Sequence, residues 1–137
     1  MWLSTVRSGS RWAEMSGRAA PRMEIQRGEI WWADLAEPRG SEPGYRRPVV
    51  IVQANSFNRS RIATVLCVVL TTNLRLMESP GNVLVSAKSS GLPRDSVANV
   101  SQMVTLDRAF LEEHVGHLPP RLMNAVDAGL KLVLGLS

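Results

Sequence analysis

The stretch PVVIVQANSFNRSRIATVLCVVLTTN, residues 48–73, contains two apolar runs separated by a polar connection. Residues 48–52 form a continuous run of β-branched side chains after Pro48, and residues 62–70 are the most hydrophobic segment of the chain. Both compositions are typical of buried strands. The polar residues 55–60 between them are predicted to hold a short helical turn. The stretch therefore predicts a β-structured core.

Three further strands are predicted on either side of this stretch. Residues 30–35 are rich in β-formers and end at the loop signal Pro38-Arg39-Gly40. Residues 83–85 follow a Pro-Gly-Asn turn, and residues 97–106 alternate polar and apolar side chains, with Gln102 interrupting the apolar face. In a half-buried strand, neighbouring side chains point to opposite faces, so at most one of Trp31 and Trp32 is expected in the core.

The C-terminal segment changes to helical periodicity. Pro119-Pro120 fits a helix start, Lys131 lies where the helix dipole favours a cation, and Gly135 fits the stop. One apolar stripe is predicted from Leu122, Val126, Leu130, Val133 and Leu134. Five strands followed by one amphipathic helix predict an α+β, mainly β domain, built as a small, strongly curved antiparallel barrel with a C-terminal helix.

Length and composition fit one domain. The chain has 137 residues, of which 45% are hydrophobic, and a single cysteine, Cys67, so no intrachain disulfide can form. The longest apolar run, residues 62–70, is far shorter than the roughly 20 residues of a membrane span. This composition fits a cytoplasmic protein without a membrane partner.

Residues 1–22 differ from the rest of the chain. They are rich in Arg and Ser, and they lack the apolar core of a secretory signal. An organelle transit peptide has a similar composition, but a strand-like pattern begins directly after Met23. We therefore expect residues 1–22 to be a disordered or loosely packed extension and residues 23–137 to form the domain.

The positive charge is concentrated in one part of the chain. The net charge is +4, and 16 residues are Lys or Arg, all of them arginine except Lys88 and Lys131. A genome that favours arginine codons would give the same composition, but not the same placement. Between residues 39 and 61, Glu42 is the only acid among the arginines Arg39, Arg46, Arg47, Arg59 and Arg61. This clustering favours a polyanionic partner bound on one face.

Common catalytic motifs are absent from the sequence. There is no GxSxG, Walker, HExxH or GxGxxG pattern. His114 and His117 lie beside two glutamates just before Pro119-Pro120, and they are predicted to be solvated loop residues without a third metal ligand at a plausible spacing. Cys67 lies in an apolar run, where packing is the expected role.

Several short segments, in one order and spacing, carry a family resemblance. They are residues 27–35, Gly40-Ser41-Glu42, Arg47-Pro48, Leu70-Thr71, residues 91–96, and Gln102 before Thr105-Leu106-Asp107. In these segments the chain resembles, over about residues 25–136, the MazF/PemK (Kid) family of type II toxin–antitoxin ribonucleases.

The resemblance implies a fold, an activity and partners. The fold would be a small SH3-like antiparallel β-barrel of about five to seven strands with a C-terminal helix. The activity would be sequence-selective cleavage of single-stranded RNA (mRNA) that needs no metal or other cofactor and leaves a 2′,3′-cyclic phosphate and a 5′-hydroxyl. The chain would form a homodimer and bind an acidic MazE-like antitoxin.

The resemblance also implies catalytic roles for Arg47, Thr71 and Glu42, with Ser41 beside Glu42. A guanidinium can stabilise the negative charge of a pentacoordinate phosphorus, but arginine stays protonated and is no conventional base. Thr71 would orient the phosphate or the 2′-OH, although Thr72 remains an alternative. Glu42 would accept the 2′-OH proton or hold an arginine in place, and both roles remain open.

A wider set of polar residues is expected to contact RNA. Arg39 and Arg46 would contact phosphates at the rim. Amide and hydroxyl groups of the kind that read base edges come from Asn55, Asn58, Thr72, Asn73 and Gln102. Two other functions remain alternatives, a CcdB-like toxin that poisons gyrase through its C-terminal helix and a non-catalytic RNA-binding barrel.

Overall fold

The computed structural model describes residues 24–35 and 45–137. The strands are β1 (Glu29–Leu35), β2 (Tyr45–Ile51), β3 (Thr64–Thr71), β4 (Val83–Val85), β5 (Ser96–Asp107) and β6 (Leu111–His117). The helices are α2 (Asn55–Asn58), α3 (Ala87–Ser90) and α4 (Pro120–Leu134), with 3-10 turns η1 (Leu74–Glu78) and η2 (Arg108–Phe110). The predictions about residues 1–22 and about Arg39, Ser41 and Glu42 lie outside the described residues.

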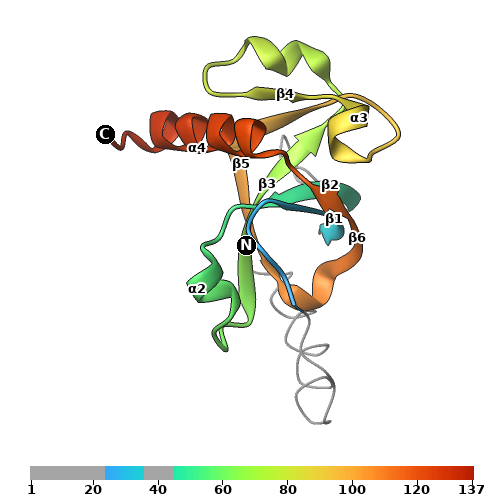
Figure 1. The fold of residues 1–137 in the computed structure, drawn as a ribbon, viewed down its shortest axis with the longest axis vertical. Helices are drawn as coiled ribbons and strands as arrows, with labels where there is room; N and C mark the ends of the chain where they lie inside the picture. The colour runs from blue at the N-terminus through green and yellow to red at the C-terminus, as the bar shows by residue number, and fades with distance from the viewer. Residues whose placement is uncertain (1–23, 36–44) are drawn as a thin grey trace.

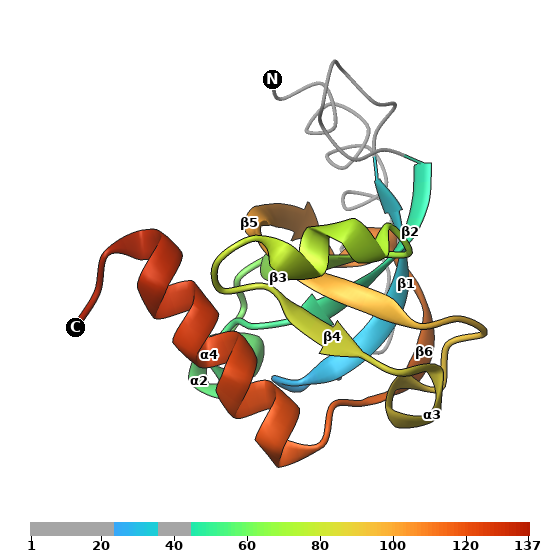
Figure 2. The same cartoon turned by 90° about the horizontal axis from the view of Figure 1, so that it is seen from above.

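The strands form one antiparallel sheet in the order β4-β5-β3-β2-β1-β6. The sheet curls into a half-barrel, and α4 lies across it beside β4 and β5 (Figures 1 and 2). This architecture confirms the prediction of a mainly β, strongly curved antiparallel barrel with a C-terminal helix. The predicted short helical turn is also confirmed, as α2.

Both faces of the sheet are buried, which explains the continuous apolar runs of β2 and β3. Val50 and Val68 belong to a first cluster that α4 covers with Leu122, Met123 and Val126. Side chains of opposite orientation, such as Val49 and Val69, belong to a second cluster on the other face. A strand that is buried on both faces needs apolar residues at every position.

The structure confirms the prediction that at most one of the two tryptophans of β1 lies in the core. Trp31 is buried in the second cluster, with 9% of its surface exposed. Trp32 points the other way and is only partly buried, against the first cluster.

Three predictions about elements need correction. The strand β6 was not predicted, and it holds His114 and His117, which therefore do not lie in a loop. Neighbouring residues of β3, Val68 and Val69, pair with Met103 and Asn99 of β5. Residues 100–102 of β5 therefore form a bulge, which breaks the alternation predicted for this strand. In α4, the predicted apolar stripe is buried only as far as Leu130, and Val133 and Leu134 are exposed.

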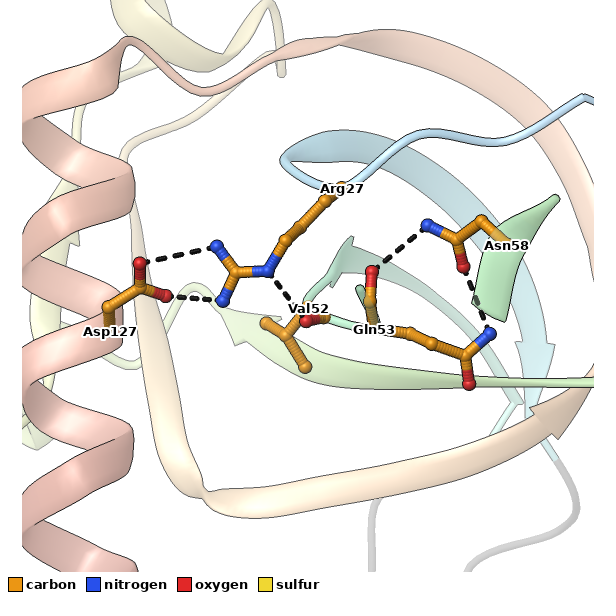
Figure 3. Close-up of polar contacts among 5 residues, drawn as sticks. All are labelled: Arg27, Val52, Gln53, Asn58 and Asp127. Carbon is orange, nitrogen blue, oxygen red and sulfur yellow. Dashed lines mark hydrogen bonds and ion pairs between the residues drawn. The ribbon is translucent and has the colours of Figure 1, made fainter. Parts of the chain in front are cut away.

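Helix α4 is fastened to the sheet by a part-buried ion pair (Figure 3). The guanidinium of Arg27 donates through Nη1 and Nη2 to the two carboxylate oxygens of Asp127, at 3.2 and 2.5 Å. Its Nε donates to the carbonyl of Val52, directly after β2, at 2.9 Å. Arg27 thereby joins α4 to the sheet. No helix within the described ranges is long and apolar enough to cross a membrane.

Candidate functional site

Arg47 lies at the exposed start of β2. Tyr45, Arg46 and Arg47 are all exposed, and burial of the strand begins after Pro48. The ladder between β1 and β2 pairs Arg47 with Ala33 and Arg46 with Asp34. Since side chains alternate along a strand, Arg47 shares the face of Val49 and of the second cluster.

Arg47 and Thr71 lie at the same end of the β2–β3 pair. The ladder pairs Val49 with Val69 and Ile51 with Cys67, and the Val49–Val69 pair is its last at this end. Arg47 lies two residues beyond this pair on β2 and Thr71 two residues beyond it on β3, so both belong to the face of Val49 and Val69. A guanidinium and a hydroxyl are therefore carried at the same end of two neighbouring strands, where Arg47 is exposed and Thr71 is half-buried.

The segment after Thr71 turns sharply into η1. The hydroxyl oxygen of Thr71 accepts a hydrogen bond from the backbone N–H of Asn73 at 3.2 Å, so its own hydrogen can still be donated. The side-chain oxygen of Asn73 accepts from the N–H of Arg75 at 3.3 Å and caps η1. Thr72 and Asn73 are exposed, and both are therefore accessible to a ligand that contacts Thr71.

The bulge of β5 adds an amide to the same region. Gln102 lies in the bulge, and its side-chain oxygen accepts a hydrogen bond from Asn99 Nδ2 at 3.0 Å. Asn99 is 5% exposed and pairs with Val69, two positions from the pair between Thr71 and Val97. The sequence pattern placed Asn99 on the polar face of its strand and did not single it out, because it could not show that both faces of the sheet are buried.

Arg46 lies on the opposite face of β2 from Arg47. Its guanidinium stacks on the ring of Trp32, 4.5 Å from the ring centre. It also donates to Glu112 at 3.0 Å and to Glu113 at 2.9 Å, both on β6. The positive charge of Arg46 is thus engaged by two carboxylates away from the face of Thr71.

Asn55 and Asn58 lie at the other end of β2. At about 3.3 Å per residue, the strand separates them from Arg47 by roughly 15 Å. Asn58 is 4% exposed. Its Oδ1 accepts from Gln53 Nε2 and its Nδ2 donates to the backbone carbonyl of Gln53, both at 2.9 Å (Figure 3). The side-chain oxygen of Asn55 accepts from the N–H of Arg27 at 2.7 Å. These amides hold the connection around α2, and the structure does not bring them to Arg47 and Thr71.

The remaining reactive side chains lie apart from this region. On β6, His114 Nε2 is 3.5 Å from a carboxylate oxygen of Glu29, and its ring centre is 5.3 Å from that of Trp31. Burial raises the pKa of the Cys67 thiol, which keeps it protonated, as expected of a packing residue. Among the residues that the structure describes, no group of three or more His, Cys, Asp or Glu is placed to hold a metal ion.

Known proteins resemble the chain over almost all of its described part. Residues 26–134 match the family described as PemK-like, MazF-like toxin of type II toxin–antitoxin system. Endoribonuclease MazF6 of Mycobacterium tuberculosis (strain H37Rv) is 50% identical over 114 residues, which cover 83% of this chain and 100% of the relative.

Two solved structures have a similar fold. A mycobacterial endoribonuclease in complex with its cognate antitoxin has a TM-score of 0.65 and 28% identity, covering 85% of this chain and 98% of the other. MazF of Deinococcus radiodurans (Form-I) has a TM-score of 0.70 over 84% of this chain and 100% of the other. At 20% identity, this second likeness concerns the fold alone.

Proposed function

The chain belongs to the family of PemK-like, MazF-like toxins of type II toxin–antitoxin systems and is an endoribonuclease, and from this premise we propose that it cleaves single-stranded RNA at a site built on Arg47 and Thr71. The reaction would need no metal ion and would leave a 2′,3′-cyclic phosphate and a 5′-hydroxyl. Cleavage of mRNA would stop translation and growth. The observation that supports this proposal is the pairing of β2 with β3, which carries Arg47 and Thr71 two residues beyond the Val49–Val69 pair at one end of both strands.

Attack by the ribose 2′-oxygen fits the chemistry of these two side chains. The bond between the 2′-oxygen and phosphorus forms while the bond between phosphorus and the 5′-oxygen breaks, and negative charge accumulates on the non-bridging oxygens. The guanidinium of Arg47 would stabilise that charge with two N–H donors. The hydroxyl of Thr71 would donate to the phosphate or orient the 2′-OH.

Two protons must also move in this reaction. The 2′-OH loses one, and the departing 5′-oxygen takes one up from water. For Glu42 we propose one of two roles. It accepts the proton of the 2′-OH, or it holds an arginine in place. Glu42 and its neighbour Ser41 lie outside the described residues, so their proposed roles rest on the family motif.

The proposed RNA contacts among the described residues are Thr72, Asn73 and Gln102. Arg39 and Ser41 are proposed from the sequence alone, because they lie outside the described residues. The exposure of Thr72 and Asn73 supports their part in this set. The positions of Arg46, Asn55 and Asn58 give no support for a contact with RNA bound at Arg47 and Thr71, and we leave these three out of the proposed contacts.

The proposal includes two protein partners. One is an acidic antitoxin, because a mycobacterial relative was solved in complex with its cognate antitoxin. The other is a second copy of the chain. The exposed apolar end of α4 supports a homodimer, since apolar clusters on a surface commonly mark interfaces. Its side chains are 45–62% exposed and comprise Leu132, Val133, Leu134 and Leu136.

The proposal is tested by incubating the purified protein with a long RNA in EDTA and mapping the new ends. We expect cleavage at a short recurring sequence, with 5′ ends that a polynucleotide kinase labels without prior dephosphorylation. Cleavage that requires added Mg²⁺, or that leaves 5′-phosphates, would contradict the proposed mechanism. RNA binding without any cleavage would instead support the non-catalytic barrel, and gyrase co-purification would support the gyrase poison.

A further inference from the structure

Asn82 connects the segment that follows Thr71 to the bulge of β5. It lies in the turn between η1 and β4 and is half-buried. Its Nδ2 donates to the carbonyl oxygen of Leu76 in η1 at 2.8 Å. Its Oδ1 accepts from the backbone N–H of Val100, in the bulge of β5, at 3.0 Å. One amide thus uses both its donor and its acceptor to hold a turn against a bulge.

Each of the two segments carries a proposed RNA contact. The segment η1 begins at Asn73, whose N–H donates to the hydroxyl oxygen of Thr71. The bulge carries Gln102, held by Asn99. Hydrogen bonds therefore run from Thr71 through η1 to Asn82 and on to the bulge. A bulge leaves backbone groups outside the regular ladder, so the N–H of Val100 depends on this side chain.

The turn that carries Asn82 is itself fixed by α4. Gly81 has a φ of +85°, and a Cβ built on it would lie 3.2 Å from the Cα of Gly129. A Cβ built on Gly129 would lie 2.1 Å from the carbonyl oxygen of Gly81. The backbones of the turn and of α4 are thus in direct contact. This contact fixes the position of the turn, and with it the position of Asn82 relative to η1 and the bulge.

We propose that Asn82 is a positioning residue, which sets the relative placement of Asn73 and Gln102 and thereby RNA affinity and base selectivity. This inference rests on the proposed function. The side-chain hydrogen bonds of Asn82 go to Leu76 and Val100 and not to Arg47 or Thr71, so its loss should change binding more than the chemical step. An amide is suited to the role, because it offers one acceptor and two donors on a short side chain.

The test is Asn82→Ala, with Asn124→Ala on the exposed face of α4 as the matched control. Steady-state cleavage of a short RNA gives KM and kcat, and end mapping on a long RNA gives selectivity. We expect Asn82→Ala to raise KM about ten-fold, because a loosened turn and bulge must be ordered when RNA binds, with kcat within about two-fold and additional cleavage sites. Asn124→Ala should match the wild type in all three.

A merely structural role predicts a different result. Partial unfolding would lower the fraction of active enzyme, and so the apparent kcat, while KM and the set of cleavage sites stayed as in the wild type. That result overturns the proposal. If Asn82→Ala does not fold, Asn82→Asp decides, since it keeps the acceptor for Val100 and loses the donor to Leu76. An unchanged KM and unchanged sites for Asn82→Asp then overturn the proposal, and a raised KM supports it.

Cleavage by the wild-type protein distinguishes a failure of the proposed function from a failure of the role proposed for Asn82. An inactive wild type would contradict the proposed function itself. An active wild type together with an Asn82→Ala variant of unchanged KM and unchanged sites would contradict only the role of Asn82.

Discussion

Arg46 and Arg47 are neighbours in the chain, yet the pleat of β2 gives them opposite environments. Arg46 stacks on Trp32 and pairs with Glu112 and Glu113. Arg47 shares a face with Val49 and lies at the same end of the β2–β3 pair as Thr71. Two side chains of the same type and exposure class are therefore expected to respond differently to the same substitution.

Arg47→Ala is expected to abolish detectable cleavage and leave the fold intact. The guanidinium would act mainly in the transition state, where the loss of one charge-stabilising donor costs about 10²–10³ in rate. Arg47→Lys should also be slow, because an ammonium cannot donate bidentately. Single-turnover cleavage is the measurement, with Arg121→Ala, an exposed arginine of α4, as the charge-matched control. Wild-type rates from a folded Arg47→Ala protein would refute the assignment.

Arg46→Ala is expected to change cleavage by less than about ten-fold. Its ion pairs are exposed, and exposed pairs contribute about 0–1 kcal/mol to the free energy of unfolding. The same kinetic assay, run with thermal unfolding, measures both effects. A loss of cleavage as large as that of Arg47→Ala, in a folded protein, would show that Arg46 reaches the RNA despite its carboxylate partners.

Thr71→Val is expected to slow cleavage and to weaken RNA binding little. Valine keeps the shape of threonine and removes the hydroxyl, which in this structure also accepts from the N–H of Asn73. Binding is measured with an RNA that carries a 2′-deoxy sugar at the cleavage site, and Thr72→Val is the matched control. Normal cleavage by Thr71→Val together with slow cleavage by Thr72→Val would assign the role to Thr72.

Residue types suggested candidates for the site, and strand geometry decided how they are arranged. Arg47 and Thr71 were identified through the family motif, but their placement at one end of β2 and β3 depends on a strand register that no local pattern encodes. Asn58 was predicted to read bases because an amide suits both recognition and internal bonding; it is buried and bonded to Gln53. Asn99 was predicted to lie on the polar face of its strand, but both faces of the sheet are buried, and Asn99 donates to Gln102.

Among the elements, those with a strong period were predicted well. The run of β-branched residues gave β2, and the proline start and glycine stop gave α4. The edge strand β6 was missed, because its sequence Leu-Glu-Glu-His-Val-Gly-His has neither an apolar run nor a clear alternation. Its place is set by pairing with β1, a long-range contact that local propensity does not contain.

The contact of α4 with the turn before β4 predicts a strong effect for Gly129→Ala. Alanine would favour the helix by about 1 kcal/mol. Its Cβ, however, would lie 2.1 Å from the carbonyl oxygen of Gly81, so backbone would have to move. Overpacking of this kind costs about 1–3 kcal/mol or more, and the clash outweighs the propensity.

We therefore expect Gly129→Ala to lower the melting temperature by several degrees. Thermal unfolding measures this change, and Asn124→Ala on the same helix should leave the melting temperature nearly unchanged. An equally stable Gly129→Ala protein would show that the turn and α4 separate at little cost.

Across the whole molecule, burial and charge are distributed unevenly. The half-barrel is apolar on both faces, whereas the far end of α4 exposes Leu132 and Leu134 to solvent. The arginines at residues 39–61 lie before β2, on it and around α2. An acidic partner that folds onto the protein would be attracted to the same charges as RNA.

The last prediction is competition between RNA and antitoxin at the face of Arg47. A labelled acidic antitoxin peptide should be displaced by RNA that carries a 2′-deoxy sugar at the cleavage site, with an apparent dissociation constant that rises in proportion to the RNA concentration. Salt should slow the association more than it weakens the finished complex, because charges at the rim act mainly on the encounter. Arg47→Ala should weaken both ligands, whereas Arg121→Ala should weaken neither. A ternary complex in which each ligand binds with unchanged affinity would exclude a shared site and place inhibition at a distance.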